Sequence, residues 1–423
     1  MWGAAAVRAL AGLVLLHALG AVLIALASRT SWRAALARPS SALVALAALY
    51  LVSLGAPGVG VLVVAAVATR WRRPRTDLVP ARFPWPAFVA LAALVLARPW
   101  VPTQWDEYVW LGKARLESLG FGAGVRAALD ASQQLIPRGY PTLWPSAVGW
   151  VSLGHDALST HTLAASLLVL LALAAALDAW APLLPDRLGW PAIAAVLAVP
   201  LAWVHMRSTY VDLPLGLLGV ALLGQLLRGT DARPPVEATA LALVLVGFKD
   251  EGLAHVLAAS AAAWLVVGRR GGAWRLVVPA VLALVATGLW RWLERRAGVD
   301  NVDHALSAPY WPWVPTLAQL LWRHASELFS WGVFWAVALA VLLGRPDGDG
   351  PRALRWLLLA DLTFIAVELL CGPERVRVFA ENGTLVNRLL MQAWPAAAGA
   401  VLFALATAPR SSSPRSAPAM PAA

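Results

Sequence analysis

The chain has 423 residues, of which 60% are hydrophobic and only 13% are charged, and its mean hydropathy is +0.68. Soluble domains carry about 25% charged residues, so this composition excludes a protein that lies wholly in water. The net charge of +11 does not indicate a nucleic-acid-binding protein. The arginines lie in short segments between apolar runs, which is the pattern that orients membrane proteins.

Apolar runs of 15 to 30 residues recur from one end of the chain to the other. About 20 helical residues cross a bilayer, and a helix satisfies its own backbone hydrogen bonds in hydrocarbon, whereas a strand does so only inside a closed barrel. The pattern therefore predicts an all-α, polytopic bundle of about ten to twelve transmembrane helices. The predicted spans are 3–27, 41–68, 84–98, 162–185, 190–205, 210–227, 238–248, 252–268, 276–292, 326–344, 356–371 and 389–408.

Two segments have a second interpretation. The tripeptide at residues 25–27, Ala-Leu-Ala, resembles a signal-peptidase site, but the preceding run is long for a signal sequence and favours an uncleaved first helix. The segment 238–268 is also compatible with one long helix that carries charges inside it. The serine- and proline-containing segment 409–423 is predicted to be a disordered tail.

The positions of the arginines predict which loops share one side of the membrane. If the N-terminus is inside, the segments assigned to the inside have about twice the arginine density of those assigned to the outside. This assignment places loops 99–161 and 291–325 outside, together with three acidic motifs. The loop 28–40 opposes the assignment, because it would carry three arginines on the outside.

The first acidic motif is Asp106-Glu107, just beyond the third apolar run. One carboxylate of such a pair can accept a hydroxyl proton while the other orients it, which is general-base chemistry. Lys113 and Arg115 follow about two helical turns later and could neutralise a phosphate. A purely structural alternative is a capping box that pairs Thr103 with Asp106 at the start of a helix.

Aromatic and proline residues mark a second stretch of the same loop, Arg138-Gly139-Tyr140-Pro141 and onward to Trp144. Tyr140 and Trp144 could stack on a sugar. Tyrosine and tryptophan also gather at membrane interfaces for physical reasons alone, and that interpretation is favoured when the stretch is considered by itself.

Two further motifs begin apolar runs. In Tyr210-Val211-Asp212, the aspartate is suited either to a binding site or to capping a helix. In Lys249-Asp250-Glu251, three charges lie between apolar runs, and charges at that depth usually face a cavity or a partner. The chain has only two lysines, Lys113 and Lys249, and each lies near an acidic pair.

The late residues add a cation and two acids. Arg388 precedes the last apolar run and is a natural partner for phosphate oxygens or lipid head groups. Asp361 and Glu368 are seven residues apart on one helical face and are expected to point into the bundle and pair there. No spacing indicates a metal site, although the three motif aspartates at positions 106, 212 and 250 could hold a divalent cation if they converge.

These motifs, in this order, resemble the multi-spanning glycosyltransferases of the C-type fold, which take a sugar from a polyprenyl-phosphate carrier. The residues that carry the resemblance, which spans 84 to about 400, are Asp106-Glu107, Tyr140-Pro141, Trp144-Pro145, Tyr210 to Pro214, Lys249 to Gly252, and Arg388-Leu389-Leu390 ahead of Pro395. The segment at 249–252 is similar to the Lys-Asn-Glu-Gly of bacterial members. Protein O-mannosyltransferases and lipid A aminoarabinose transferases are distantly similar.

The resemblance implies a bundle with a helical outer loop, divided into two additional N-terminal helices (1–83) and a catalytic module (84–408). It implies transfer of a sugar to a hydroxyl acceptor on a glycan, lipid or protein, by a single displacement with inversion. Asp106 would be the base, oriented by Glu107. The substrate-binding residues would be Lys113, Arg115, Arg138, Tyr140, Trp144, Tyr210, Asp212, Lys249, Asp250, Glu251 and Arg388. No cofactor is required, and a divalent cation is possible.

Two other functions remain open. One is a secondary transporter or lipid flippase, in which Asp250, Asp361 and Glu368 would couple ions or protons. The other is a polymerase or ligase of surface polysaccharide that uses a diphosphate-linked glycan. The arginine- and alanine-rich composition fits a bacterial plasma membrane, with the site expected to face outward.

Overall fold

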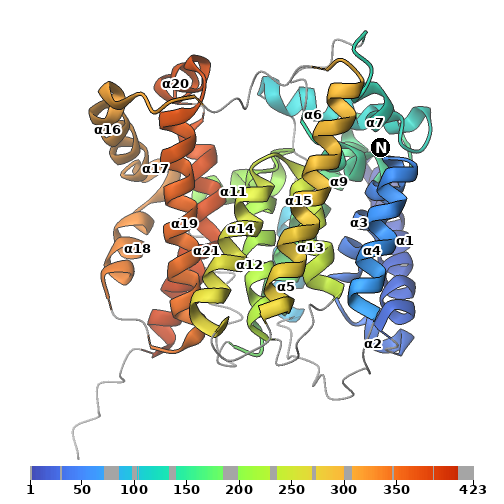
Figure 1. Cartoon of the computed structure of the whole chain (residues 1–423), viewed down its shortest axis with the longest axis horizontal. Coiled ribbons are helices and arrows are strands. Elements are labelled where there is room, and N and C mark those ends of the chain that lie inside the picture. Colours follow the sequence, from blue (N-terminus) through green and yellow to red (C-terminus); the bar gives the residue numbers. More distant parts are fainter. Residues whose placement is uncertain are drawn as a thin grey trace, which may run out of the picture.

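The computed structural model describes residues 2–28, 31–70, 85–97, 102, 104–132, 140–183, 199–228, 236–268, 273–299, 307–344, 347–383 and 385–407. Every regular element in these ranges is a helix, and the helices stand side by side in one bundle (Figure 1). The prediction of an all-α protein is confirmed. The segment 409–423, predicted to be a disordered tail, lies outside the described residues.

Four described helices are long and apolar enough to cross a membrane, and a bent pair of helices adds a fifth candidate. The four are α1 (Trp2–Ser28), α9 (Leu158–Trp180), α15 (Ala273–Arg296) and α21 (Val386–Thr407), and the pair is α11 (Pro200–Arg207) with α12 (Asp212–Arg228). Shorter apolar helices accompany them: α3 (Ser41–Ser53), α4 (Ala56–Arg70), α5 (Trp85–Ala97), α13 (Val236–Phe248), α14 (Gly252–Val267) and α18 (Phe334–Leu343). These helices fit a polytopic membrane protein. The larger number of predicted spans stays a prediction.

One end of the bundle carries most of the short helices, and we call it the loop end. It lies at the top of Figure 1. Its helices are α6 (Trp105–Arg115), η1 (Leu116–Leu119), α7 (Ala123–Ala128), α8 (Leu143–Val151), η3 (Trp311–Trp313), α16 (Val314–Ala325), α17 (Leu328–Trp331) and α20 (Glu374–Glu381). The described part of loop 99–161 is therefore helical, as predicted. The remaining long helix, α19 (Asp349–Cys371), packs against α14 and α21.

A buried glutamate organises the short helices of the loop end. The two oxygens of Glu117 accept hydrogen bonds from the backbone N–H groups of Gly122 and Gly124, from the hydroxyl of Ser146 and from the indole of Trp150, at 2.8–3.0 Å. These bonds tie η1, α7 and α8 together. They fix the position of α6, which continues into η1, so the described part of loop 99–161 is a folded part of the molecule.

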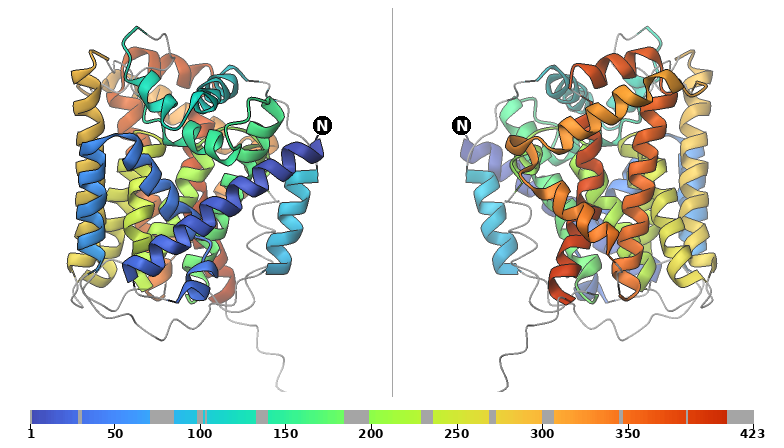
Figure 2. Two further views of the ribbon diagram at one scale, coloured as in Figure 1. Left: turned by 90° about the vertical axis from the view of Figure 1, so that its right-hand side faces the viewer. Right: turned by 90° about the vertical axis from the view of Figure 1, so that its left-hand side faces the viewer.

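The N-terminal helix begins at the loop end. Gly12 in α1 packs directly against the backbone of Val151 at the end of α8. The helix α1 runs from there to the opposite end of the bundle, where α2 (Trp32–Leu36) follows it. His17, in the middle of α1, lies with Nε2 2.8 Å from the carbonyl oxygen of Leu36. Figure 2 shows α1 crossing the bundle obliquely between these ends. The prediction that placed the N-terminus and loop 99–161 on opposite sides is therefore wrong.

The reason is a break inside the run 41–68, which was predicted to be one span. The run forms two antiparallel helices, α3 and α4, with a turn at Gly55, whose φ is +77° and suits glycine. Ser53 at the end of α3 lies beside Gly122 at the loop end. The additional crossing places residues 31–40 at the opposite end, where Arg33 and Arg38 no longer oppose the expected charge pattern.

Two breaks between helices and the start of α21 meet at the loop end and position the predicted motifs. The helices α11 and α12 are bent by 99° at residues 208–211. The segment 238–268 forms two packed helices, α13 and α14, with a turn at residues 249–251, so the alternative of one long helix is wrong. The helix α21 packs against α12 and α19. Near its start, Arg388 and Gln392 bond to Asp212, the residue that follows the break between α11 and α12.

Candidate functional site

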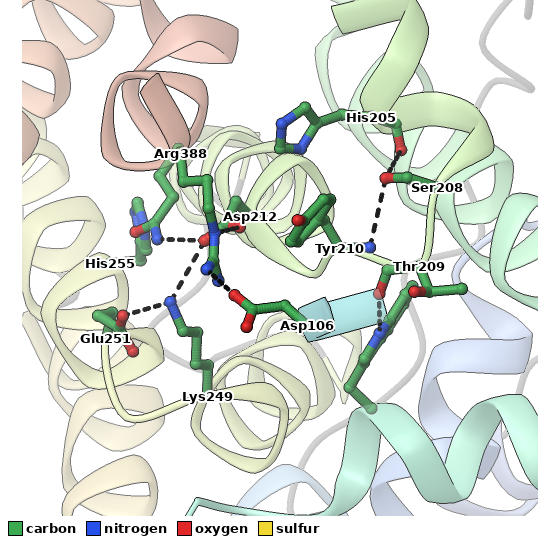
Figure 3. A network of polar contacts seen from close by, with 12 residues as sticks. Asp106, His205, Ser208, Thr209, Tyr210, Asp212, Lys249, Glu251, His255 and Arg388 are labelled. Carbon is green, nitrogen blue, oxygen red and sulfur yellow. Dashed lines mark hydrogen bonds and ion pairs between the residues drawn. The ribbon is translucent and has the colours of Figure 1, made fainter. Parts of the chain in front are cut away.

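Asp212, the first residue of α12, is the centre of a cluster of charged side chains (Figure 3). Its side chain is completely buried, and it accepts three hydrogen bonds. The donors are Lys249 Nζ at 3.2 Å, Arg388 Nε at 2.9 Å and Gln392 Nε2 at 2.9 Å. A buried carboxylate is stable only with such partners, so Asp212 and the two cations are fixed relative to one another.

Arg388 joins the bundle to the short helices of the loop end. Its guanidinium donates through Nε to Asp212 and through Nη1 to Asp106 on α6. It also lies 4.9 Å from the ring centre of Tyr210, in a cation–π arrangement. The side chain of Asp106 is 47% exposed and that of Arg388 is 18% exposed. The cluster is therefore open to the surrounding medium on the Asp106 side.

The predicted motif at residues 249–251 divides between two ion-pair groups. Lys249 pairs with Asp212 and with Glu251. Asp250 pairs with Arg291 on α15, at 2.5 Å. We call the first group the Asp212 cluster. It consists of Asp106, Asp212, Lys249, Glu251 and Arg388, and its three carboxylates slightly outweigh its two cations.

Two predicted residues fix the bend between α11 and α12. Glu107 is fully buried, and its carboxylate accepts from the backbone N–H groups of Thr209, at 3.4 Å, and Gln104, at 3.3 Å. The Gln104 bond belongs to a capping box, one residue later than the predicted box at Thr103. The indole of Trp144, also fully buried, donates to the carbonyl oxygen of Thr209 at 2.8 Å. Both side chains therefore position the residues next to Asp212.

The other predicted loop residues lie at different distances from the cluster. Tyr140 faces Trp110 edge-on and lies close enough to Glu251 and Lys249 to interact with their charges. Burial raises the pKa of the Tyr140 hydroxyl well above its usual value. Lys113 lies over the ring of Trp110, and burial lowers the pKa of its ammonium group to about 8.

Arg115 lies outside the cluster, because it forms an exposed ion pair with Asp156. Arg138, a predicted substrate-binding residue, lies outside the described residues. The structure thus brings together residues from three of the predicted motifs and the late arginine. It places Asp250 and Arg115 in separate ion pairs.

Two residues of the site were missing from the sequence-based prediction. Gln392 and His255 lie behind Asp212, where His255 Nε2 is 3.2 Å from Gln392 Oε1. Each follows a predicted residue by one helical turn, because Gln392 is four residues after Arg388 and His255 is four residues after Glu251. That i, i+4 spacing places both on the same helical face as the motif and could have revealed them.

The described residues contain no group of three or more His, Cys, Asp or Glu side chains that could hold a metal ion. The three aspartates considered for a divalent cation are held separately. Asp106 and Asp212 share Arg388, while Asp250 pairs with Arg291. Whether the protein uses a divalent cation stays a prediction.

The chain was compared with family models, curated proteins and solved structures. No family model matches it, and no curated protein or solved structure matches it either. The geometry of the Asp212 cluster is therefore the basis on which a function can be proposed.

Proposed function

We propose that the chain is a membrane glycosyltransferase of the C-type architecture. It transfers a sugar from a polyprenyl-phosphate carrier to a hydroxyl group by a single displacement with inversion. The observation that carries this proposal is the convergence of Asp106, Asp212, Lys249 and Arg388, which lie far apart in the sequence, around one partly open site at the loop end. Membrane lipids surround the bundle and deliver the carrier, so a site at one end of the helices suits a lipid-borne phosphate.

Arg388 and Lys249 supply the positive charge for the phosphate. Arginine matches phosphate oxygens with two parallel donors, and donors fixed before the reaction stabilise charge that develops on a leaving group. Asp106 accepts from one of these donors, Nη1 of Arg388. A carrier phosphate therefore competes with Asp106 for Arg388, whereas the buried Asp212 keeps both cations in place.

Displacement from Arg388 frees Asp106 to act as the general base. Its carboxylate accepts the proton of the acceptor hydroxyl, and the resulting oxygen forms a bond to the anomeric carbon of the sugar. The bond between that carbon and the phosphate oxygen breaks, and the carrier phosphate leaves with the electron pair. Attack from the face opposite the phosphate inverts the configuration. Tyr140, beside Lys249 and Glu251, is placed to contact the sugar.

The partners follow from this chemistry. The donor is a polyprenyl-phosphate-linked sugar, the acceptor is a glycan, lipid or protein hydroxyl, and nucleic acid has no role. We place the protein in a bacterial plasma membrane with the loop end facing outward. No cofactor takes part in the steps above.

The test is transfer from a panel of labelled polyprenyl-monophosphate sugars, comparing wild type with Asp106→Asn and Glu107→Gln. Loss of a general base lowers turnover by about 10²- to 10⁴-fold, and we expect this for Asp106→Asn. Glu107→Gln should retain more activity, because Glu107 supports the bend. Unchanged turnover in a folded Asp106→Asn variant would remove Asp106 as the base. Diphosphate-linked donors tested in parallel distinguish a polysaccharide polymerase or ligase.

A secondary transporter or lipid flippase is the second candidate. The observations that favour it are the broken pair α11 and α12 and the contact between His255 and Asp361, buried inside the bundle. Purified protein that moves substrate across proteoliposomes, but forms no glycosylated product, would support transport over transfer.

A further inference from the structure

Behind the Asp212 cluster, three buried side chains form a polar chain that leads deeper into the bundle. Asp361 on α19, His255 on α14 and Gln392 on α21 are each at most 5% exposed. His255 Nδ1 lies 3.2 Å from Asp361 Oδ1, and His255 Nε2 lies 3.2 Å from Gln392 Oε1. Gln392 then donates to Asp212 at 2.9 Å. Figure 3 shows His255 on the side of Asp212 opposite Asp106.

The hydrogen-bond donors and acceptors of these side chains have one consistent arrangement. The buried carboxylate of Asp212 pairs with two cations and accepts only, so the NH₂ group of Gln392 must face it. The amide oxygen of Gln392 therefore faces His255 and requires a proton on His255 Nε2. The other ring nitrogen of His255 faces the carboxylate of Asp361. The rotation of the Gln392 amide is thus set by both of its neighbours, Asp212 and His255.

The packing of α12 brings these groups close together. A Cβ at Gly219 would lie 3.3 Å from Nδ1 of His255, which is tighter than an ordinary contact. One turn earlier, Gly216 packs directly against the backbone of Gln392. Glycine at both positions lets α14 and α21 approach the same side of α12, and neither helix can shift freely to compensate for a lost contact.

We propose that His255 is a positioning residue for the cations that bind the carrier phosphate. It holds the Gln392 amide in the orientation that donates to Asp212, and Asp212 in turn holds Arg388 and Lys249. This inference rests on the proposed function of the site. His255 touches neither the substrate nor the reacting atoms.

The consequence of losing His255 follows from the geometry of the amide. Without a donor at His255, the amide oxygen of Gln392 is buried without its hydrogen-bond partner, and only Asp212 still holds the NH₂ group. The Gln392 side chain then moves toward another donor for its oxygen, and its bond to Asp212 weakens. The positions of Arg388 and Lys249 around Asp212 become less well defined. The loss of one hydrogen bond to a charged group sets the upper limit of the effect.

The experiment measures binding of a short-chain polyprenyl monophosphate, without sugar, to the full chain in lipid nanodiscs, with thermal unfolding recorded alongside. His255→Phe keeps an aromatic ring but removes both nitrogens. His161→Phe is the matched control, because His161 is equally buried, at 2% exposed, but lies on α9 outside the polar chain. We expect about a 10-fold weaker affinity for His255→Phe and wild-type affinity for His161→Phe.

A rescue variant separates positioning from packing. His255→Gln places an amide NH₂ group where Nε2 stood, so it should restore most of the affinity. Gln392→Glu replaces the donor to Asp212 with an oxygen, and it should weaken binding even if His255→Phe fails to fold. Equal affinities for His255→Phe and His161→Phe, or a lack of rescue by His255→Gln, overturn the inference. Absence of binding by the wild type overturns the proposed function itself.

Discussion

Asp106 and Glu107 are neighbours in the sequence, but they face different surroundings. Asp106 is half exposed and shares Arg388 with Asp212, whereas Glu107 is buried and bonded to the backbone of Thr209. An exposed ion pair contributes about 0–1 kcal/mol, so Asp106 can leave Arg388 at little cost. Only this carboxylate of the pair is free to alternate between a cation and an acceptor hydroxyl.

This difference predicts opposite effects of Asp106→Asn on binding and on turnover. The variant should bind a polyprenyl monophosphate more tightly than wild type, by up to about 5-fold, because the phosphate no longer competes for Arg388. Binding to purified protein in nanodiscs measures the effect. Glu107→Gln is the control, since it removes the same charge one residue away without freeing Arg388. Equal affinities for all three proteins would mean that Asp106 and the phosphate do not share the arginine.

The buried ammonium group of Lys113 leads us to expect that the stability of the protein depends on pH. Burial lowers the pKa of its ammonium group from 10.5 to about 8. Between these values the unfolded chain holds the proton and the native chain releases it, so the native state gains stability as the pH rises through this window. Lys113→Met removes the free-energy cost of burying the charged ammonium group. We expect a gain of up to about 3 kcal/mol below pH 8, at about 1.4 kcal/mol per pKa unit, which disappears near pH 10.5.

Thermal unfolding of Lys113→Met and wild type at pH 7 and pH 10 checks this expectation. The control is Arg115→Met, because Arg115 lies two residues away in an exposed ion pair that contributes little. A gain of the same size at both pH values would show that packing, and not the desolvated charge, separates the two proteins.

The paths of the helices show what the sequence alone could reveal. Long apolar runs identified the helices, and the motifs at their ends were correctly expected to share one end of the bundle. The break at Gly55 was not recognised, because an apolar run of 28 residues satisfies the length of one tilted span as well as that of two short helices. A single unrecognised turn then inverted the predicted side of every segment before it.

The sequence also could not distinguish adjacent acids. In both Asp106-Glu107 and Asp250-Glu251, one acid belongs to the Asp212 cluster and the other does not. Adjacent side chains point in different directions, about 100° apart on a helix such as α6, so the packing of the neighbouring helices decides which one faces the site. That packing is a tertiary property, and the motif does not contain it.

The position of α2 gives a prediction about sidedness. Arg38 pairs with Glu237 at the start of α13, and α13 runs from there to the Lys249 turn at the loop end. Residues 31–40 therefore lie at the end of the bundle opposite the loop end. We expect cysteines introduced at Ser31 and at Ser118 to react with a membrane-impermeant thiol reagent from opposite sides. The natural Cys371 is first replaced by serine, and that background serves as the control. Labelling of both positions from the same side would contradict the arrangement of α1 to α4.

Charged side chains occupy both ends of the bundle and leave its middle largely apolar. The Asp212 cluster lies at the loop end. At the opposite end, Arg38 pairs with Glu237 and Arg228 lies 3.7 Å from Asp178. The pair with Arg38 connects the segment before α3 to α13. The first four helices are therefore tied to the helices that carry the site.

Further helix contacts attach the first four helices to the helices that carry the site. The helix α1 packs against α8 and α9, and α3 packs against α13. Tyr50 of α3 fills the space beside Gly247, two residues before Lys249. A Cβ at Gly247 would lie 2.9 Å from the Tyr50 ring. The N-terminal segment was expected to be an addition to a separate catalytic module. Its packing instead supports the helix that presents Lys249.

This arrangement predicts that residues 84–423 alone do not form a stable protein. Removal of 1–83 exposes the faces of α9 and α13 that α1 and α3 cover, and it leaves Glu237 buried without Arg38, which costs several kcal/mol. We expect the truncated chain to aggregate on extraction and to bind no polyprenyl phosphate, as measured by size-exclusion chromatography and nanodisc binding. Coexpression of 1–83 as a separate fragment should restore both properties, because the two pieces share a packed interface. A monodisperse truncated chain with wild-type affinity would show instead that the first four helices are dispensable and that the Asp212 cluster is held by α6 and α12 to α21 alone.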